Sequence, residues 1–309
     1  MRIAAIVPCH NEVVAINKVV TDLHDAVPEM TVYVYDNNST DGTDEAARQA
    51  GAIIRYEHNK GKGNVIRRAF ADVDADVYLM IDGDDTYDAT AAPALIEALL
   101  EGPYDQVLGV RNEVVSGAYR PGHSVGNRIF NVVVGKIFGV PVNDMLSGYR
   151  VFSRRFVKSF PAVSREFETE TELTIHAANL RVPQTEVQVG FKDRPAGAES
   201  KLRTYRDGWK ILTLILHLTR IERPVFFHSI LAGLIALVGV VLGLPVVVEF
   251  FRTGLVPRLP TAVLASVIIV IASAVYFLGL QLSSIKRTKD ENMRLVYLSM
   301  GAVEVRQDD

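Results

Sequence analysis

The sequence has a single cysteine, Cys9, in 309 residues, and its formal net charge is only −3. One cysteine excludes an intrachain disulfide framework and fits a reducing compartment. The small net charge argues against a broad nucleic-acid footprint, which requires an excess of lysine and arginine. The apolar run at residues 1–8 is too short for a secretory signal peptide, and we expect it to form a strand instead.

The sequence also contains neither a complete P-loop nor a Gly-x-Gly-x-x-Gly segment, so the standard loops for ATP and NAD are missing. A weaker phosphate signal lies at residues 59–63, where two glycines let a backbone approach a ligand and Lys60 and Lys62 add positive charge. The same pattern is common in surface turns. We therefore expect a nucleotide diphosphate held together with a divalent ion rather than ATP or NAD.

The chain is hydrophobic, with 49% apolar residues and a mean hydropathy of +0.16, and the longest apolar runs lie near the C-terminus. Residues 225–248 and 261–285 contain no charged side chain, and each run exceeds the roughly 20 residues that cross a bilayer. We predict two transmembrane helices within residues 224–285; two buried core helices are the alternative. Arginine and lysine lie mostly outside the pair, which favours a hairpin with both ends in the cytoplasm.

Two segments flank this hairpin. Residues 204–223 are apolar but shorter than a span, and Trp209, Lys210 and Arg220 lie near the ends of the apolar stretch. This pattern predicts an interfacial amphipathic helix, with a buried core helix as the alternative. We expect residues 1–203 to form the catalytic domain and residues 286–309 to form a cytoplasmic tail.

Residues 1–110 alternate between strand-like and helix-like stretches, which predicts an α/β fold with a mostly parallel, doubly wound sheet. In the first unit, we expect Asn11 to cap a helix that runs through Val27. The predicted strands cover residues 3–7, 31–35, 52–56, 77–81 and 106–110.

Ligands bind beyond the carboxyl ends of the strands in such sheets, and polar clusters lie at those ends in this sequence. They occupy residues 8–12, 36–42 and 58–63, and the fourth strand leads into Asp82, Asp84 and Asp85. Crowded carboxylates repel one another unless a cation lies among them, and hard oxygen ligands favour Mg²⁺ or Mn²⁺. Each cluster alone could be an ordinary polar turn, but four clusters on one edge predict a single site.

Seven segments of the sequence resemble the family 2 glycosyltransferases of GT-A fold, and among them the polyprenyl- or dolichyl-phosphate sugar transferases. The resemblance covers roughly residues 1–215, and the hairpin is similar to the membrane anchors of bacterial members. It implies a Rossmann-like sheet of GT-A type, followed by the interfacial helix and the transmembrane hairpin. The matching segments are residues 7–12, 36–43, 59–63, 82–84, 109–111, 144–150 and 194–201.

The resemblance implies roles for individual residues, with Asp36 at the nucleobase. The nucleotide-binding set is Pro8, Asn11, Glu12, Asp36, Asn38, Lys62 and Asp82. The metal ligands would be Asp82 and Asp84, and the region near the donor sugar and its phosphates would contain Asp144, Ser147 and Gly148. A loop near the acceptor phosphate would contain Arg194, Ser200 and Lys201. Residues 36–38 read Asp-Asn-Asn, whereas many members have Asp-Asp-Gly.

Four residues are candidates for the chemical step: Asp84, Arg111, Arg128 and Glu170. The two arginines would bind phosphate, although each could equally be a solvated surface cation. Glu170 lies near the place where many family 2 enzymes have an aspartate base, but it could also belong to a charged first helical turn that the helix dipole favours.

These features together predict an inverting, metal-dependent enzyme that transfers a sugar from a nucleotide-diphosphate sugar, expected to be UDP-linked, to polyprenyl phosphate. The expected cofactor is Mn²⁺ or Mg²⁺. We expect an integral membrane protein of bacterial or archaeal type, with a cytoplasmic catalytic domain and no nucleic-acid partner. The sequence leaves open whether the chain forms a homo-oligomer.

Two alternative functions remain from the sequence. One is a glycosyltransferase with another lipid or polysaccharide acceptor, although the only tryptophan, Trp209, does not fit the Gln-x-x-Arg-Trp motif of processive synthases. The other is a non-catalytic membrane adaptor with a transferase-like fold.

Overall fold

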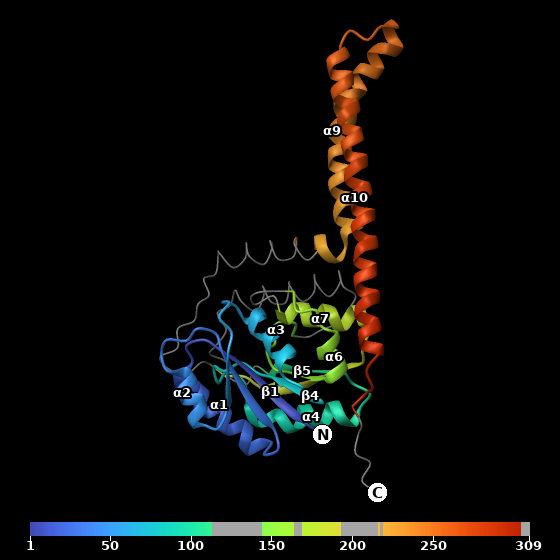
Figure 1. Ribbon diagram of the computed structural model, residues 1–309. Helices are drawn as coiled ribbons and strands as arrows, with labels where there is room; N and C mark the ends of the chain where they lie inside the picture. Colours follow the sequence, from blue (N-terminus) through green and yellow to red (C-terminus); the bar gives the residue numbers. More distant parts are fainter. Residues whose placement is uncertain (113–143, 164–168, 193–215, 217–218, 304–309) are drawn as a thin grey trace. The chain divides into compact units, whose positions relative to one another are not determined.

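A computed structural model describes the chain except for residues 113–143, 164–168, 193–215, 217–218 and 304–309 (Figure 1). The chain divides into two compact units. The first unit comprises Met1–Thr204 together with Asn292–Asp309, and the second comprises Tyr205–Glu291. The second unit is therefore inserted between two parts of the first.

The first unit is built on a seven-stranded sheet with the order β3-β2-β1-β4-β6-β5-β7. Strands β1 to β4 are parallel and β7 is parallel to β5, whereas β6 runs antiparallel between β4 and β5. The mostly parallel sheet is thus confirmed, and the antiparallel strand is an addition that the sequence pattern did not predict. The strands are β1 Ile3–Cys9, β2 Thr31–Asp36, β3 Ile53–Tyr56, β4 Val77–Met80, β5 Gln106–Asn112, β6 Arg150–Ser153 and β7 Gln184–Gly190.

Both faces of this sheet are buried under helices, which explains the continuous apolar runs of the strands. In β1, Ala5 and Val7 pack into one core cluster, and Ala4 and Ile6 pack into the other. On the first face lie α1 Val13–Ala26, α2 Thr43–Gln49 and α4 Ala92–Glu101, the last preceded by the short helix η1 Ala89–Ala91 (Figure 1). On the opposite face lie α3 Lys62–Asp72, α6 Arg154–Ser159 and α7 Thr169–Leu180.

Helix α1 begins differently from the sequence-based expectation. Its N-cap is Glu12, which makes no capping hydrogen bond through its side chain, and Asn11 has a φ of 58°. The prediction that Asn11 caps this helix is therefore wrong. In the left-handed conformation, which asparagine tolerates better than most residues, Asn11 Oδ1 instead accepts a hydrogen bond from the Thr40 N–H at 2.9 Å.

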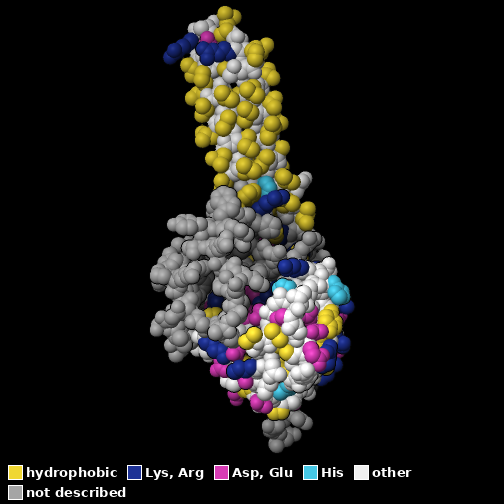
Figure 2. Space-filling view, turned by 90° about the vertical axis from the view of Figure 1, so that its left-hand side faces the viewer, with side chains coloured by type: hydrophobic (Ala, Val, Ile, Leu, Met, Phe, Trp, Pro, Cys, Tyr) yellow, Lys and Arg dark blue, Asp and Glu magenta, His cyan; other side chains and the backbone are white. Residues whose placement is uncertain are grey.

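The second unit contains two long apolar helices, α9 Pro224–Thr253 and α10 Leu259–Leu298, the latter extending into the first unit. Both are long and apolar enough to cross a membrane, and only 17% of the most apolar window of each is buried. Hydrophobic side chains cover the outside of the pair (Figure 2). Small residues recur every seventh position along the contact, and such residues let helix backbones approach closely: Ala232 and Gly239 in α9, and Ala265, Ala272 and Gly279 in α10.

The last turns of α10, from Asn292 onward, belong to the first unit and pack against its core. The Tyr297 hydroxyl donates a hydrogen bond of 2.6 Å to Asp105 Oδ2, and the Arg155 guanidinium lies 4.7 Å above the Tyr297 ring. Arg155 also forms two hydrogen bonds with the buried Asp105 carboxylate, at 2.5 and 2.8 Å. Arg294 donates to the carbonyl of Asn179 near the end of α7. Part of the segment expected to be a tail is thus a helix that packs against the first unit.

We predict that Tyr297→Phe destabilises the first unit by about 1–2 kcal/mol, because it removes a hydrogen bond to a buried carboxylate. Thermal unfolding of the full chain in detergent measures the change. Tyr297→Ala, which also removes the ring, should cost more. Tyr56→Phe is the matched control, since the exposed Tyr56 also donates a hydroxyl hydrogen bond to a carboxylate, that of Asp44. An equal loss in the two Phe variants would contradict the packing role of Tyr297.

Candidate functional site

The loops that follow β1 and β2 are joined by hydrogen bonds at the carboxyl edge of the sheet. The Asn11 N–H donates to Ser39 Oγ at 3.0 Å, and the Glu12 N–H donates to Thr43 Oγ1 at 2.9 Å. These bonds fix Pro8, at the end of β1, and the next four residues beside the loop that contains Asn38.

The loop after β2 is tied in turn to the loop after β3 through Asn37. Its side-chain amide donates to the carbonyls of Glu57 and Asn59 and accepts from the Gly61 N–H at 2.7 Å. Asn38 has a φ of 64°, a conformation that glycine adopts freely and asparagine tolerates. Asn38 therefore occupies a backbone position that a glycine would also adopt without strain.

Asp36 is buried at the end of β2, and only one of its two carboxylate oxygens accepts a hydrogen bond from the described residues. Oδ2 accepts a hydrogen bond from the Ser39 N–H at 3.1 Å. Oδ1 is buried and has no hydrogen-bond partner within the described residues. An unsatisfied buried acceptor is costly, and a ligand N–H would relieve that cost.

Asp82 and Asp84 follow β4 at the same edge, with Gly83 between them. A Cβ at Gly83 would lie 2.4 Å from Cys9 Sγ, so only glycine allows this loop to approach β1 so closely. Burial, with smaller contributions from Glu12, Asp36, Asp82 and Asp84, raises the pKa of the Cys9 thiol. Four carboxylates from three loops thus act on one buried sulfur, and that sulfur is an inert packing group.

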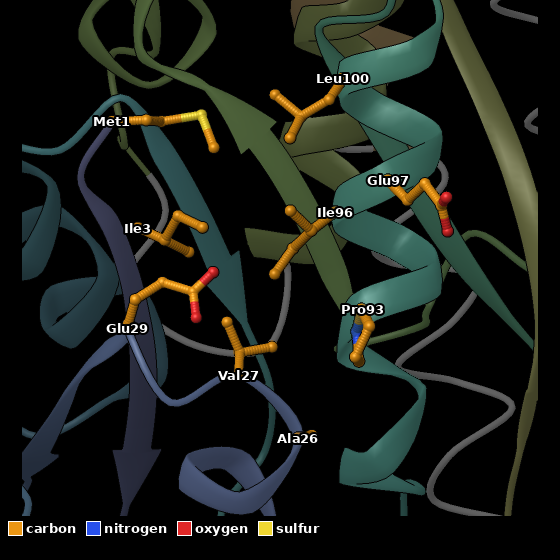
Figure 3. A pocket seen from close by; sticks show the side chains of 9 residues that line it. All are labelled: Met1, Ile3, Ala26, Val27, Glu29, Pro93, Ile96, Glu97 and Leu100. Atoms are coloured by element: carbon orange, nitrogen blue, oxygen red, sulfur yellow. The ribbon is translucent and has the colours of Figure 1, made fainter. Parts of the chain in front are cut away.

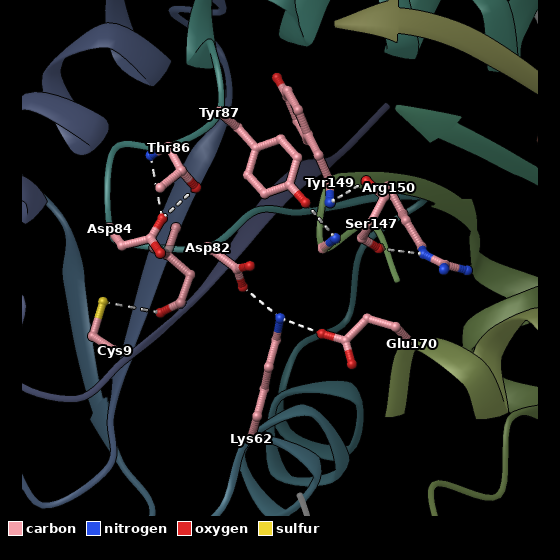
Figure 4. Close-up of polar contacts among 12 residues, drawn as sticks. Cys9, Lys62, Asp82, Asp84, Thr86, Tyr87, Ser147, Tyr149, Arg150 and Glu170 are labelled. Carbon is pink, nitrogen blue, oxygen red and sulfur yellow. Dashed lines mark hydrogen bonds and ion pairs between the residues drawn. The ribbon is translucent and has the colours of Figure 1, made fainter. Parts of the chain in front are cut away.

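The two aspartates have different surroundings (Figure 4). Asp84 is 7% exposed, and its Oδ1 accepts hydrogen bonds from the Thr86 hydroxyl at 2.6 Å and the Thr86 N–H at 3.2 Å. Asp82 is paired with the Lys62 ammonium, which also binds Glu170 Oε1 at 2.5 Å. Three residues distant in sequence therefore form one charged cluster.

The charge on Lys62 is strongly stabilised. Burial by itself would lower the pKa of Lys62, but the carboxylates of Asp82 and Glu170 outweigh this and raise its pKa above the usual value. Because a raised lysine pKa favours the charged form up to and beyond the ordinary value near 10.4, Lys62 remains an ammonium throughout the neutral range.

The segment before β6 forms a wall against Asp82. The Gly148 N–H donates to the Tyr87 hydroxyl at 2.9 Å, and Ser147 Oγ donates to the Gly109 carbonyl at 2.6 Å. A Cβ at Gly148 would lie 2.4 Å from Asp82 Oδ2, so this glycine lets the backbone contact the carboxylate. Burial raises the pKa of Tyr87 to about 12, and Tyr87 is therefore a neutral hydrogen-bonding group.

Arg150 stabilises the segment around Gly148 by binding its backbone carbonyls. It is fully buried, and its guanidinium donates to the carbonyls of Ser147 and Met145 and to Thr174 Oγ1, at 2.9, 2.7 and 2.9 Å. Thr174 lies on α7, one turn after Glu170, and donates to the Glu170 carbonyl at 3.0 Å. Arg150 thus links the Gly148 segment to the helix that carries Glu170.

Arg111, predicted to bind phosphate, forms a two-point ion pair with Asp144, at 2.6 and 2.7 Å. Its guanidinium also lies 5.2 Å above the Phe191 ring. This geometry holds the cation in one orientation, with its side chain 18% exposed.

The donor set suits a divalent ion that is also bound by a diphosphate. Within the described part of the chain, no cluster of three or more His, Cys, Asp or Glu side chains could hold a metal by itself. Asp82 and Asp84 offer hard carboxylate oxygens, and Mg²⁺ is usually held by one or two carboxylates together with substrate phosphates and water. The two residues therefore fit such an ion as part of its coordination shell.

The structure brings most of the predicted site residues to this edge and adds residues that the sequence did not indicate. Glu170 lies in the first turn of α7, but it faces Lys62 instead of serving only the helix dipole. No motif in the sequence indicated that Tyr87 belongs to the site, and Arg150 was noted only as the last residue of the matching segment 144–150. Outside the described residues lie Arg128, Arg194, Ser200, Lys201 and most of the expected interfacial helix.

A cavity of about 320 Å³ lies elsewhere, beside Met1, Ile3, Pro93 and Leu100 (Figure 3). Its walls include the start of β1, at the opposite edge of the sheet from the aspartates. Glu29 and Glu97 are the charged side chains among its lining residues. It is not part of the acidic site.

Comparison with known proteins gives a consistent result. The model of glycosyl transferase family 2 matches residues 4–160. The glycosyltransferase AglJ of Haloferax volcanii is 35% identical over 229 residues, which cover 74% of this chain and 75% of AglJ. A dolichyl-phosphate hexose transferase of the same organism is 26% identical over 221 residues, covering 72% of this chain and 95% of the relative.

Among solved structures, glucosyl-3-phosphoglycerate synthase from Mycobacterium tuberculosis, in complex with Mn²⁺, UDP and glucosyl-3-phosphoglycerate, has a TM-score of 0.58. The two proteins are 21% identical, and the similarity covers 71% of this chain and 78% of the synthase. At this identity the similarity establishes the fold.

We predict that Gly148→Ala displaces the Asp82 carboxylate, because the new methyl group would lie against Oδ2. The carboxylate is the end of a partly exposed side chain and can move, so the cost in unfolding free energy should stay near the low end of about 1–3 kcal/mol for overpacking. Titration with Mn²⁺ should nevertheless show weaker binding. Gly233→Ala, where a methyl group meets no atom within 4 Å, is the control; equal Mn²⁺ affinity in both variants would contradict the prediction.

Proposed function

The chain belongs to the family 2 glycosyltransferases, and we propose that it transfers a hexose from a UDP-linked sugar to polyprenyl phosphate in a membrane. The observation that carries this proposal is the combination, in one chain, of an acidic sheet edge and two helices apolar enough to cross a bilayer. A water-soluble acceptor would not require such helices, whereas a long-chain lipid phosphate is confined to the membrane surface. The relative named as a dolichyl-phosphate hexose transferase supports the same acceptor class.

The donor end of the proposal is supported by Asp36 and the two aspartates after β4. The unsatisfied Asp36 Oδ1 would accept an N–H from the nucleobase. Asp82 and Asp84 would hold a divalent ion, which supplies electrostatic stabilisation to the diphosphate when bound. The similar synthase was crystallised with Mn²⁺ and UDP, which supports Mn²⁺ or Mg²⁺ and a UDP donor here.

In the proposed reaction, an oxygen of the lipid phosphate attacks the anomeric carbon as the bond from that carbon to the donor diphosphate breaks. Direct displacement inverts the configuration. A phosphate monoester has its second pKa near 6, so the acceptor is already largely a dianion at neutral pH and no base is needed. Lys62 and Arg111 would attract the negative charge that develops on the departing nucleoside diphosphate.

The proposed location follows from the distribution of charge around the hairpin. Arg220 and Arg223 precede α9, and Lys286, Arg287 and Lys289 follow the apolar part of α10, whereas Arg252 and Arg258 lie near the connection. By the positive-inside rule, this distribution supports a cytoplasmic location for the catalytic unit.

The direct test is incubation of the full chain with polyprenyl phosphate and a panel of UDP- and GDP-sugars, followed by mass spectrometry of the lipid. We expect a polyprenyl-phosphate hexose from a UDP-sugar, and its loss when EDTA removes divalent ions. Transfer only to another glycolipid or to a polysaccharide would replace the acceptor in this proposal. Nucleotide binding with no transfer to any acceptor would support the adaptor alternative.

We predict that Asp36→Ala raises the donor KM by roughly ten- to a hundredfold, because a hydrogen bond to a charged acceptor contributes about 1.5–3 kcal/mol. The dependence of the rate on Mn²⁺ concentration should change little, since Asp36 would contact the base. Steady-state kinetics at saturating Mn²⁺ measures both effects. Asp74→Ala, an exposed carboxylate paired with Arg2, serves as the control, and an unchanged donor KM in Asp36→Ala would remove Asp36 from the donor site.

A further inference from the structure

Lys62 lies between two carboxylates that differ in access to solvent (Figure 4). The Glu170 side chain is 6% exposed and that of Lys62 is 10% exposed, whereas the Asp82 side chain is 29% exposed. A ligand arriving from solvent therefore reaches Asp82 without disturbing the buried Lys62–Glu170 pair.

Glu170 is held in place independently of Lys62. It lies in the first turn of α7, and α7 is joined through Thr174 to the fully buried Arg150. Its second carboxylate oxygen, Oε2, is buried and has no hydrogen-bond partner among the residues that the structure describes. The Glu170 carboxylate is therefore compensated by Lys62, and separating the two would leave a buried charge unpaired, which is strongly unfavourable.

Asp82 is in the opposite situation. It is flanked by the Gly148 backbone on one side and by Lys62 on another, and it retains an exposed surface. The Asp82–Lys62 contact resembles a partly exposed ion pair, which a stronger cation can replace at modest cost. A divalent ion carries twice the charge of an ammonium and competes directly for the same oxygen atoms.

Lys62 also has a favourable position for a second partner. It is the first residue of α3, an eleven-residue helix, and the N-terminus of a helix favours negatively charged groups. An ammonium released by Asp82 at this position would face the same edge of the sheet where the donor diphosphate is expected.

We propose that Lys62 is an internal counter-ion that occupies Asp82 before the donor binds and moves to the donor diphosphate when a divalent cation takes Asp82. This inference rests on the proposed function. Glu170 keeps the ammonium within reach of both partners throughout the exchange. Glu170 is therefore a positioning residue that acts through Lys62, and it is not the base of the reaction.

If this exchange occurs, one double substitution should strengthen the binding of Mn²⁺ and weaken the binding of UDP. The Lys62→Met, Glu170→Gln double variant removes both charges of the buried Lys62–Glu170 pair together, and the competitor for Asp82 is gone. The Mn²⁺ dissociation constant without nucleotide should fall about two- to fivefold, the range expected for removal of a partly exposed ion pair. The UDP dissociation constant at saturating Mn²⁺ should rise by a similar factor, because the diphosphate loses a cation.

The single variant Glu170→Gln tests the same exchange without removing Lys62. Lys62 then has Asp82 as its one remaining charged partner in the cluster, so Mn²⁺ should bind several-fold more weakly than in the wild type. Turnover at saturating Mn²⁺ should stay within about tenfold of the wild type, whereas loss of a general base costs 10²–10⁴-fold. Arg68→Met is the matched control, because it removes an exposed cation from the same helix.

The measurements use the full chain in detergent, with free Mn²⁺ followed by electron paramagnetic resonance and UDP binding by calorimetry. Opposite changes in the double variant, with Arg68→Met unchanged, support the exchange. Parallel losses of both affinities, or a 10²-fold loss of turnover in Glu170→Gln, overturn it. A wild-type chain that binds no UDP even with Mn²⁺ would overturn the proposed function itself. If the double variant does not fold, an unchanged Mn²⁺ affinity in Glu170→Gln still overturns the exchange.

Discussion

Repulsion among carboxylates at one edge of the sheet is the constraint on which the rest of the site depends. Asp36, Asp82, Asp84 and Glu170 are all buried or partly buried, and ionised carboxylates in such surroundings require compensation. Lys62 supplies it for two of them, and Thr86 donates two hydrogen bonds to a third. The remaining oxygen of Asp36 has no partner within the described residues, and it lies where a nucleobase would bind in the proposed function.

The loops that carry these groups are rigid because they are hydrogen-bonded to one another. Asn37 joins the loops after β2 and β3, Asn11 joins those after β1 and β2, and Arg150 joins the Gly148 segment to α7. Asn37 and Asn11 bind backbone groups of loops distant in sequence, whereas Arg150 binds nearby carbonyls and the distant Thr174 hydroxyl. A site held in this way keeps its charged groups in place before a ligand arrives, which lowers the cost of binding.

The chain combines two regions with different requirements. The catalytic unit buries apolar side chains on both faces of a sheet, whereas α9 and α10 expose most of theirs, as helices in a lipid environment do. The contact between the two helices uses small residues at seven-residue intervals, because packing rather than exclusion of water holds helices together in a bilayer. The return of the chain into the catalytic unit at Asn292 means that the second helix ends on the core of that unit, through Tyr297 and Asp105.

Periodicity and composition by themselves determined the parallel strands, the apolar hairpin and the acidic edge, because each depends on short-range patterns along the chain. The Asp82-Gly83-Asp84 segment and Asp36 could be found in this way, since polar groups at the ends of parallel strands meet at one edge. Only the tertiary structure decided that Lys62 lies between Asp82 and Glu170, that Arg111 is held by Asp144, and that the antiparallel β6 enters the sheet. These pairings join residues up to 108 positions apart, and their energies depend on burial and on distances that no local pattern specifies.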